Sequence, residues 1–596
     1  MGEHLSRLRE ARQGFTPGVA SRRRWSDEVE AALRDLWVEA LANQGVYGPI
    51  SGVGLAAVGS LARKDTGPQS DLDLVLIHDG GAHPELSGGI EGLSNDLWYP
   101  IWDAHLELDH SVRSLKDCRG IAKTDLSASM SLLDLRGIAG DAELVDRAAS
   151  TVLADWRAGA RLRFNEIVQE QSERRAHFGR LAYLIEGDLK EAAGGLRDAL
   201  LIKAVVASWL AERPSVNYDG AYEFLLDVRD ALTSITGRHQ NVLRLAYQDE
   251  VASILGFHGS GGTDPADELL AAISQAARTI RYAYSDVKRR ALGRLESGSR
   301  RHGPRLVRGR TMPPRLSEVA PGVGELAGEL VLTSAAVPND AEVLFSLASE
   351  AAVRGLPIRL ATLAHMYRAG AGRAISERWD VHTPWPESNR VDFERILRSG
   401  RNQISVWEAL DTAGLLTEMI PPWTQIRNLP QRSAIHRHTV DRHQFEVASL
   451  IPDMASVGGQ SLTALTPQRR TALLASAFFH DIGKRPGFPH HAERGAEMIP
   501  GILGPMGYSE SVQRDVIVLT RQHLLLGDLA TSEDPSDPRT WRAVSDAVGG
   551  DAELLVCLHL LTQADASSCK PEAWGPWKAS VVERLVSEAY GSLIRG

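Results

Sequence analysis

One stretch of the sequence, residues 58–77, constrains the fold of this chain more than any other. Residues 71–77, Asp-Leu-Asp-Leu-Val-Leu-Ile, are mostly apolar and follow a Gly-Pro pair closely, which predicts a β-strand. Because residues two apart in a strand share a face, Asp71 and Asp73 are predicted to project side by side, roughly 7 Å apart. Two adjacent carboxylates raise each other's pKa unless a cation lies between them, and Mg²⁺ prefers oxygen ligands of this kind. The stretch therefore predicts a strand that carries a magnesium site.

Three upstream residues add groups that suit a phosphate. Gly59 lets a backbone approach a phosphate closely, Ser60 offers a hydroxyl and a backbone N–H, and Arg63 offers a fixed positive charge. Each signal alone has a plain structural interpretation, with Gly-Ser as a turn and Asp-Leu-Asp as the solvent face of an edge strand. The combination at this spacing resembles the nucleotidyltransferase superfamily with the DNA polymerase β type of catalytic fold. That resemblance implies two metal ions on Asp71, Asp73 and a third carboxylate, and attack on the α-phosphate of a nucleoside triphosphate.

The third carboxylate would lie on a neighbouring strand. Residues 105–113 alternate in polarity and are predicted to form that strand, with Glu107, Asp109 and Ser111 on one face. Asp109 is the preferred candidate, and Glu107 is the alternative. The choice between them stays open here, because acidic residues on the solvent face of a strand need no function.

Composition limits the class of protein. The 596 residues are enough for several domains, and an apolar content of 43% is normal for packed globular protein. No segment reaches the 18 or more apolar residues of a membrane span, and the N-terminus lacks a signal-peptide core. The three cysteines have no metal-type spacing, as expected in a reducing compartment. With a net charge of −10, the sequence predicts a cytoplasmic protein with neither a membrane nor a nucleic-acid partner.

From about residue 125 to 295 the sequence is rich in Ala, Leu, Arg and Glu and is predicted to be helical. Gly194 and Gly195 interrupt this region, either as a helix end with its loop or as a segment that closes over a nucleotide. A Gly- and Pro-punctuated basic stretch, with five arginines between Arg300 and Arg310, is predicted to be a linker. The predicted organisation is an α/β domain at 1–124, a helical domain at 125–298, a linker at 299–322, a connecting helical region at 323–430 and an all-α domain at 431–596.

The last of these regions is rich in histidine. Eight of the 19 histidines lie within residues 436–559, about a fifth of the chain. Imidazole and carboxylate ligands together suit Zn²⁺, Mn²⁺, Fe²⁺ or Co²⁺, and such sites are built between facing helices. The candidate ligands are His443, His480, Asp481, His491, His523 and Asp565. The other four, His436, His438, His490 and His559, are interpreted as structural residues.

The pair His480-Asp481, which follows an apolar helix and precedes Ile-Gly-Lys484, resembles the HD metal-dependent phosphohydrolase superfamily. In that superfamily a metal lowers the pKa of bound water so that it attacks phosphorus. The resemblance implies a first metal on His443, His480, Asp481 and Asp565. It also implies that His491 and His523 support a second metal or the phosphate, and that Lys484 neutralises phosphate charge.

Several segments narrow the resemblance further. They are Leu-Lys-Glu…Gly-Gly-Leu-Arg-Asp at 189–198, Trp-Asp…His-Ser-Val-Arg at 102–113, Arg-Asp-Ala-Leu…Thr-Gly-Arg at 229–238 and Thr-Val-Asp-Arg-His at 439–443. Together they resemble the bifunctional PII uridylyltransferase/uridylyl-removing enzymes. This resemblance implies a polymerase β-like domain, a central helical bundle and an all-α HD domain. It also implies transfer of UMP from UTP to a tyrosine of a PII signalling protein, and hydrolytic removal of that UMP, with Mg²⁺ at the first site and Mn²⁺, Fe²⁺ or Zn²⁺ at the second.

The sequence departs from the family in two ways. The family ordinarily continues into two ACT domains that sense glutamine, whereas this sequence stops at Gly596, so a response to glutamine is not expected. A more Gly-rich turn is usual at Gly59-Ser60, which leaves open UTP against ATP, and UMP against AMP. Two alternatives also stay open: a tRNA CCA-adding type of nucleotidyltransferase with an HD domain, and a degenerate regulator that binds nucleotide and PII without turnover. A basic RNA-binding surface would favour the first, and intact acidic and histidine residues argue against the second.

Overall fold

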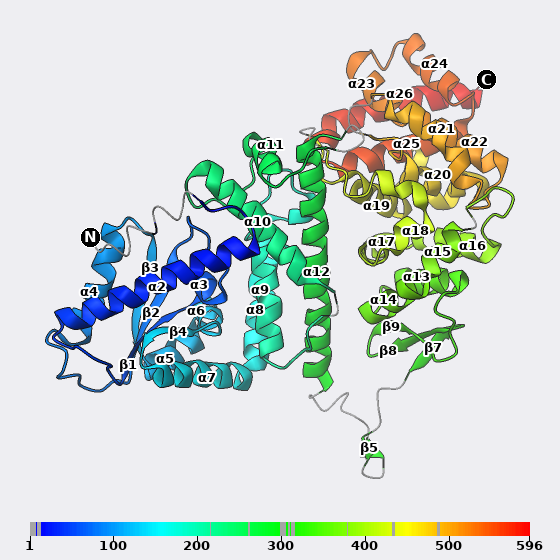
Figure 1. Cartoon of the computed structure of the whole chain (residues 1–596). Coiled ribbons are helices and arrows are strands. Elements are labelled where there is room, and N and C mark those ends of the chain that lie inside the picture. Colours follow the sequence, from blue (N-terminus) through cyan, green and yellow to red (C-terminus); the bar gives the residue numbers. More distant parts are fainter. Residues whose placement is uncertain are drawn as a thin grey trace. The chain divides into compact units, whose positions relative to one another are not determined.

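The structure, a computed structural model, describes residues 8, 14–214, 216–259, 263–297, 306–307, 310–311, 316–377, 379–431, 435–485 and 489–595 (Figure 1). The chain forms two compact units, each considered by itself. Unit 1 comprises Met1–Ala182, Glu186–His258 and Ala276–Gly303. Unit 2 comprises Tyr183–Ile185, Gly259–Gln275 and Pro304–Gly596. Within the described ranges, every helix is too short or too polar to cross a membrane.

Unit 1 is built around a four-stranded mixed sheet. Its strands are β1 (Val53–Ala57), β2 (Leu72–His78), β3 (Leu108–Ser114) and β4 (Arg136–Gly140), in the order β3-β2-β1-β4. β2 and β3 are parallel, and β1 pairs antiparallel with both β2 and β4. β1 is buried along its whole length and β2 is nearly so, which explains their continuous apolar runs. The predicted mixed α/β class of this region is confirmed.

Helices cover both faces of the sheet. On one face, alternate residues of β2 (Leu72, Leu74 and Leu76) join a core with α2 (Val19–Asn43) and α4 (Gly89–Asp103). On the other face, Val75 and Ile77 pack with side chains of α5 (Leu115–Thr124) and α7 (Ala142–Ala158). Because side chains alternate along a strand, Asp73 lies on the same face as Val75, at the end of that second core.

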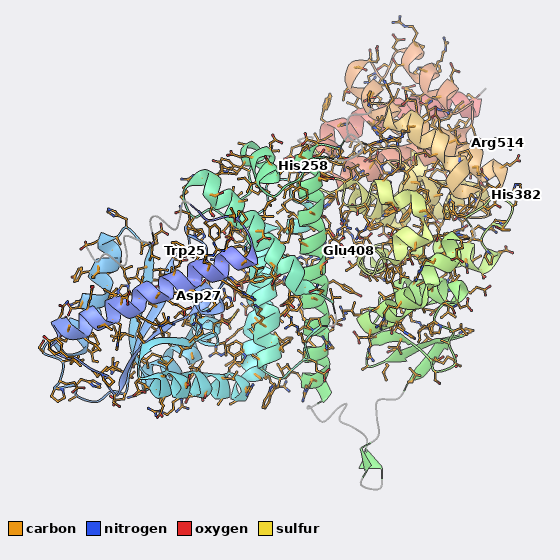
Figure 2. All side chains as sticks on the ribbon, viewed as in Figure 1. Trp25, Asp27, His258, His382, Glu408 and Arg514 are labelled. Carbon is orange, nitrogen blue, oxygen red and sulfur yellow. The ribbon has the colours of Figure 1, made fainter. Side chains whose placement is uncertain are left out.

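Helix α2 has one buried face and one exposed face, as Trp25 and Asp27 show (Figure 2). Trp25 on α2 is 4% exposed and belongs to the core under the sheet. Asp27, two positions later, is largely exposed and its Oδ1 lies 2.5 Å from Lys64 Nζ, just after α3 (Gly59–Arg63). Such an exposed ion pair contributes little to stability, so the apolar face positions α2.

Two predictions of secondary structure in unit 1 are wrong in part. β4 lies within the region predicted to be helical from about residue 125, and the sheet therefore continues beyond residue 124. The predicted strand at 105–113 begins later, at Leu108. The five residues of β4, Arg-Gly-Ile-Ala-Gly, lack the alternation of a predicted strand. β4 is therefore a strand because it pairs with β1.

The remaining helices of the first half follow the sheet in sequence, apart from α6, which lies between β3 and β4. They are α6 (Leu126–Leu132), α8 (Ala160–Phe178), η1 (Leu181–Tyr183), α9 (Leu196–Ala207), α10 (Tyr218–Thr236), α11 (Leu245–Ile254) and α12 (Pro265–Ser297).

The two adjacent glycines precede α9 and have a packing reason. Gly194 has a φ of +89°, and a Cβ there would lie 2.5 Å from the carbonyl oxygen of Ala277 on α12. A Cβ at Gly195 would lie 2.6 Å from the carbonyl oxygen of Leu189. Both positions therefore require glycine for the turn into α9, in agreement with the helix-boundary interpretation.

Unit 2 begins with strands and continues with helices. The strands are β5 (Leu306–Val307), β6 (Arg310–Thr311), β7 (Ser317–Ala320), β8 (Val323–Leu326) and β9 (Glu329–Leu332), of which the last three form an antiparallel sheet in the order β7-β8-β9. The prediction that residues from 323 onward are helical is thus wrong for β8 and β9. Most of the predicted linker at 299–322, including Arg300, Arg301, Arg305 and Arg308, lies outside the described residues.

The helices that follow confirm the predicted helical character of the second half. They are α13 (Ala341–Arg354), α14 (Leu360–Ala369), α15 (Ala371–Ser376), α16 (Glu387–Leu397), α17 (Asn402–Thr412), α18 (Leu415–Met419), η2 (Pro421–Gln425), α19 (Val440–Leu450), η3 (Ile451–Asp453), η4 (Val457–Gly459), η5 (Leu462–Ala464), α20 (Pro467–Phe479), α21 (His491–Leu503), α22 (Glu510–Gln522), α23 (Leu525–Ser532), α24 (Pro538–Ala547), α25 (Ala552–Ser568), η6 (Pro571–Trp574) and α26 (Pro576–Arg595).

An aromatic core holds α17, α19 and α20 together. Phe478 of α20 stacks on Trp423 at a centroid distance of 4.7 Å, and Trp423 stacks on Phe445 of α19 at 5.3 Å. Trp407 of α17 lies 5.0 Å from Phe478. All four side chains are fully buried. Large buried aromatic residues dominate core energetics, so this core fixes α19 and α20, the two helices whose histidines face each other in the site described below.

Candidate functional sites

The acidic residues predicted in unit 1 come together at one end of β2. Asp73 and Asp109 are register partners on the parallel strands β2 and β3, so their side chains share a face. Asp71 directly precedes β2, two residues from Asp73. Glu107 precedes β3, and its backbone carbonyl accepts a hydrogen bond from Leu72 N at 2.9 Å. The register therefore favours Asp109 over Glu107 as the third carboxylate.

Gly59 lies directly against this acidic pair. It has a φ of +59°, and a Cβ added there would lie 2.5 Å from Asp73 Oδ2. The amide of the preceding Val58 donates a hydrogen bond of 3.0 Å to the carbonyl of Asp73. A larger residue at 59 would push the carboxylate aside, so glycine keeps the space beside Asp73 open.

The electrostatics around Asp73 favour a bound cation. Burial and the nearby Asp71 and Asp109 raise the pKa of Asp73 to about 7, and the positive charges of Arg63 and Lys190 only partly oppose this. Lys190 belongs to the segment that leads into α9, and its backbone N–H donates to Asp188 at 2.8 Å. A divalent cation bound here would offset the repulsion between these carboxylates, which is consistent with the predicted magnesium site.

Arg63 is held by carboxylates. Its Nε lies 2.9 Å from Asp65 Oδ2 and its Nη1 lies 2.5 Å from Asp134 Oδ2. The hydroxyl of the buried Tyr222 donates to Asp65 at 2.7 Å. Arg63 thus provides a positive charge that acts on Asp73, but two carboxylates already pair with its guanidinium, and its predicted role toward a phosphate stays a prediction. Ser60, next to Gly59, is half-buried at the start of α3.

In unit 2 the structure brings together all six predicted metal ligands. They come from α19 (His443), the end of α20 (His480 and Asp481), the start of α21 (His491), the end of α22 (His523) and α25 (Asp565). Sets of three ligand atoms, such as those of His443, His480 and Asp481, lie within 4.8 Å of one another.

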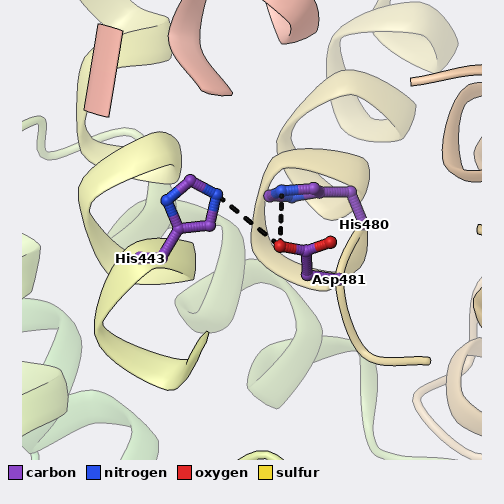
Figure 3. Close-up of side chains that lie close together, drawn as sticks. All are labelled: His443, His480 and Asp481. Atoms are coloured by element: carbon purple, nitrogen blue, oxygen red, sulfur yellow. Dashed lines mark ion pairs between the residues drawn. The ribbon is translucent and has the colours of Figure 1, made fainter. Parts of the chain in front are cut away.

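Asp481 occupies the middle of this cluster. Its Oδ2 lies 3.6 Å from His443 Nε2 and 3.5 Å from His480 Nε2 (Figure 3). Its Oδ1 lies 3.3 Å from His491 Nε2 and 3.7 Å from His523 Nε2. One carboxylate therefore faces two pairs of imidazoles, which suits either one ion or two.

Asp565 and Lys484 complete the surroundings. Asp565 Oδ1 lies 2.9 Å from His443 Nε2 and 3.9 Å from His480 Nε2. Lys484 Nζ lies 2.6 Å from Asp481 Oδ2 and donates to the side chain of Gln431, also at 2.6 Å. The lysine thus fixes the carboxylate at the centre of the cluster.

Hydrogen bonds on the far side of each ring set the tautomers. His480 Nδ1 lies 3.3 Å from the carbonyl of Ala477, and His523 Nδ1 lies 2.7 Å from the carbonyl of Thr520. Because a carbonyl only accepts, each Nδ1 carries the proton and each Nε2 presents a lone pair to Asp481.

His443 is oriented by a side chain instead. Ser568 Oγ donates to the carbonyl of Asp565 at 2.9 Å and lies 2.7 Å from His443 Nδ1. The serine oxygen therefore accepts from Nδ1–H, and His443 Nε2 is left as the ligand atom. Sequence reasoning missed Ser568, because its role depends on its position at the end of α25.

The cluster fits a divalent metal. Burial lowers the pKa of His480 to about 3 and also lowers the pKa of His523, so both rings are neutral. Burial opposes ionisation of Asp481, but Lys484 and the surrounding histidines hold its pKa well below the usual range. Within the described residues, the buried Nε2 atoms of His443 and His480 and the Oδ1 of Asp481 form no hydrogen bond. Lone pairs that face one another in a buried site require a cation between them.

The four other histidines of this region differ in position. His559 Nδ1 lies 2.8 Å from Ser456 Oγ, and His438 contacts the ring of Tyr183 edge-on at 5.6 Å, both as structural residues. His490 has a φ of +63° just before α21. His436, in contrast, lies 6.1 Å from the ring of His443, beside the cluster, where the sequence analysis did not place it.

Comparison with known proteins finds two matching family models and several similar proteins. The family model described as GlnD PII-uridylyltransferase matches residues 163–287, and the HD domain model matches residues 440–568. A Streptomyces coelicolor protein named bifunctional uridylyltransferase/uridylyl-removing enzyme is 39% identical over 99% of this chain and 67% of its own length. Proteins of the same name from Mycobacterium tuberculosis and Corynebacterium glutamicum are 37% and 34% identical, over 95% and 91% of this chain. The chain spans 66% and 73% of their respective lengths, about two thirds of these relatives.

Proposed function

The chain belongs to the bifunctional uridylyltransferase/uridylyl-removing enzyme family, and from this we propose that it transfers UMP from UTP to a tyrosine of a PII signalling protein and removes that UMP by hydrolysis. The observation that carries the proposal is the presence of two separate ligand sets in one chain. One is a carboxylate set of the kind that Mg²⁺ prefers, and the other is an imidazole–carboxylate set that suits a transition metal.

For transfer, Asp71, Asp73 and Asp109 would hold Mg²⁺. Bound there, magnesium would neutralise triphosphate charge and stabilise the departing pyrophosphate. Gly59 leaves room beside Asp73 for a phosphate oxygen. Lys190 adds positive charge close enough to lower the pKa of Asp73. UTP is preferred to ATP in this proposal on the names of the relatives alone.

For removal, His443, His480, Asp481 and Asp565 would hold a Mn²⁺, Fe²⁺ or Zn²⁺ ion, and His491 and His523 would hold a second ion or the phosphate. The metal would lower the pKa of a bound water so that it can attack phosphorus. The backbone carbonyls behind His480 and His523 keep their rings in one orientation. Lys484 holds Asp481 in place and carries the charge that would offset the phosphate.

The test of this proposal uses a PII protein, labelled UTP or labelled ATP, and Mg²⁺. We expect label to enter the PII tyrosine from UTP and to be released again as UMP. The alternative of a tRNA CCA-adding enzyme is less favoured because the net charge is −10, and labelling of tRNA instead of PII would support it. Failure to label either partner would support the degenerate regulator.

Removal of metal should separate the two activities. After treatment with a strong chelator, we expect UMP release to be lost and to return with Mn²⁺ or Zn²⁺, whereas transfer should require only Mg²⁺. The measurement is the rate of each reaction against added metal, with metal content determined in parallel. UMP release that survives in metal-free protein would contradict the proposed HD site.

The third carboxylate can be tested by a matched pair of substitutions. Asp109→Asn should reduce transfer by about 10²-fold or more, because a metal ligand worth several kcal/mol is lost. Glu107→Gln should change the rate of transfer by less than about threefold, because Glu107 lies before β3 begins and is not the register partner of Asp73. Equal losses in the two variants, measured as initial rates at saturating UTP, would reject the assignment of Asp109.

The high pKa of Asp73 predicts a pH dependence. Below about pH 7 its carboxyl is protonated, so a metal must displace a proton in order to bind. The apparent affinity for Mg²⁺ in the transfer reaction should therefore fall by up to about tenfold per pH unit below 7 and level off above it. Titrations of Mg²⁺ between pH 5.5 and 8.5 measure this effect, and an affinity independent of pH would contradict it.

A further inference from the structure

The C-terminal end of α25 carries a thiol that the proposed mechanism does not use. Cys569 follows Asp565 by one helical turn and is 8% exposed. Ligand atoms of Cys569, Asp565 and His443 lie within 4.8 Å of one another. The thiol therefore lies at the edge of the HD cluster, next to His443 and Asp565.

His436 adds a second donor at the same place. Its Nδ1 lies 3.7 Å from Cys569 Sγ. A backbone hydrogen bond of 3.1 Å from Lys570 N to the carbonyl of Ile435 attaches the loop that carries His436 to the end of α25. A neutral imidazole carries one lone pair that can bind a metal. The proximity of the two side chains is thus maintained by the backbone on both sides.

His443 points to a ligand independently of the thiol. It is 2% exposed, and within the described residues its Nε2 forms no hydrogen bond. Its other nitrogen is fixed by Ser568, the residue directly before Cys569. The same segment of α25 therefore orients the imidazole and supplies the sulfur.

Thiolate, two imidazoles and a carboxylate make a donor set typical of four-coordinate zinc. Hard cations such as Mg²⁺ have no preference for sulfur. The set with Cys569 should therefore favour Zn²⁺ over Mg²⁺ more strongly than the neighbouring set around Asp481, which has no sulfur. Because the thiolate is the form that binds a metal, binding of the ion would release the thiol proton to solvent.

We propose that Cys569 and His436, together with the shared ligands His443 and Asp565, form a zinc-binding site that competes with the catalytic arrangement of the HD cluster. This inference rests on the proposed hydrolase site, because it borrows two of its ligands. An ion held by sulfur withdraws His443 and Asp565 from His480 and Asp481. Excess Zn²⁺ should therefore inhibit UMP release in a manner that depends on Cys569.

Cobalt is the probe, because a Co²⁺–thiolate bond gives a charge-transfer absorption in the near ultraviolet. Metal-free wild-type protein titrated with Co²⁺ should develop this band. Cys569→Ser should lack it, whereas Cys557→Ser should retain it, since Cys557 is a second buried cysteine of α25 whose thiol contacts the carbonyl of Arg469. His436→Gln should keep the sulfur but weaken cobalt binding by about tenfold or more.

Three results would overturn the proposal. These are the absence of the band in wild-type protein, its persistence in Cys569→Ser, and an unchanged cobalt affinity in His436→Gln. Thermal melting of each variant shows whether it is folded, and His436→Gln provides the decision if Cys569→Ser does not fold. In activity assays, the Zn²⁺ concentration that halves Mn²⁺-supported UMP release should rise at least about tenfold in Cys569→Ser relative to Cys557→Ser.

The outcomes distinguish this inference from the proposed function. UMP release supported by Mn²⁺ without a cobalt–thiolate band would leave the hydrolase in place and remove the zinc site. A Cys569-dependent band in a protein that never releases UMP would do the reverse.

Discussion

Replacing Asp73 with asparagine is expected to reduce nucleotide transfer by about 10³-fold or more while hydrolytic removal stays within about twofold of the wild type. The loss follows from the position of Asp73 between Asp71 and Asp109, where its carboxylate would contribute to the metal site. Removal should persist because the HD ligands belong to the other unit. Both rates are measured on the same preparation with PII and with uridylylated PII.

The same substitution should stabilise the metal-free protein. The pKa of Asp73 in the folded chain is about 7, against an ordinary value of 3.8, so the ionised carboxylate disfavours folding. This cost is fully present above pH 7 and disappears as the pH falls toward 4, where the group is protonated in both states. Asp73→Asn should therefore raise the melting temperature by several degrees at pH 8 and by little near pH 4.

Asp117→Asn serves as the matched control in the same unit. Asp117 accepts hydrogen bonds from the backbone and hydroxyl of Ser114 in a capping box, which lowers its pKa. The same chemical change should thus destabilise the protein at pH 8 and leave transfer unaffected. If Asp73→Asn abolished both activities in a folded protein, the assignment of transfer and removal to separate sites would be wrong.

Replacing His480 with glutamine should produce the opposite separation. We expect UMP release to fall by about 10³-fold or more and the bound transition metal to be lost, with transfer retained. His480 is fully buried, its Nδ1 is engaged by a carbonyl, and its Nε2 faces Asp481. Among the described residues, this Nε2 forms no hydrogen bond.

His559→Gln is the control for this variant. His559 is also a buried histidine whose pKa is lowered by burial to about 4, but it pairs with Ser456 outside the cluster. It should lose some stability while it keeps its metal and both activities. Metal content by elemental analysis, together with the two rates, distinguishes the variants. Retention of metal and of UMP release in His480→Gln would refute the HD assignment.

Local patterns were sufficient for the parts of each site that lie close together in the chain. The spacing of Asp71 and Asp73 in an apolar run predicted both a strand and a shared face, and β2 follows from residue 72. The apolar run that ends in His480-Asp481 likewise predicted α20 and its two adjacent ligands. In both cases the periodicity of one element determines which side chains come together, and periodicity is visible in the sequence.

Distant partners required the tertiary structure. The sequence left Asp109 and Glu107 as alternatives, and only the parallel register of β2 and β3 places Asp109 beside Asp73. β4 has no pattern of its own and becomes a strand by pairing with β1, far away in the chain. Similarly, Cys569 and His436 looked like an isolated thiol and a structural histidine until the end of α25 placed them beside His443.

What the sequence by itself determined was therefore the family and the six residues that the structure brings together in the HD cluster. What only the tertiary structure decided was the register that places Asp109 beside Asp73, the tautomers set by Ser568, Ala477 and Thr520, and the sulfur at the edge of the HD cluster. The physical reason is the range of the interactions. Secondary-structure periodicity and adjacent ligands are local along the chain. Strand register and helix packing instead depend on contacts between segments that can lie more than a hundred residues apart, as His443 and Ser568 do.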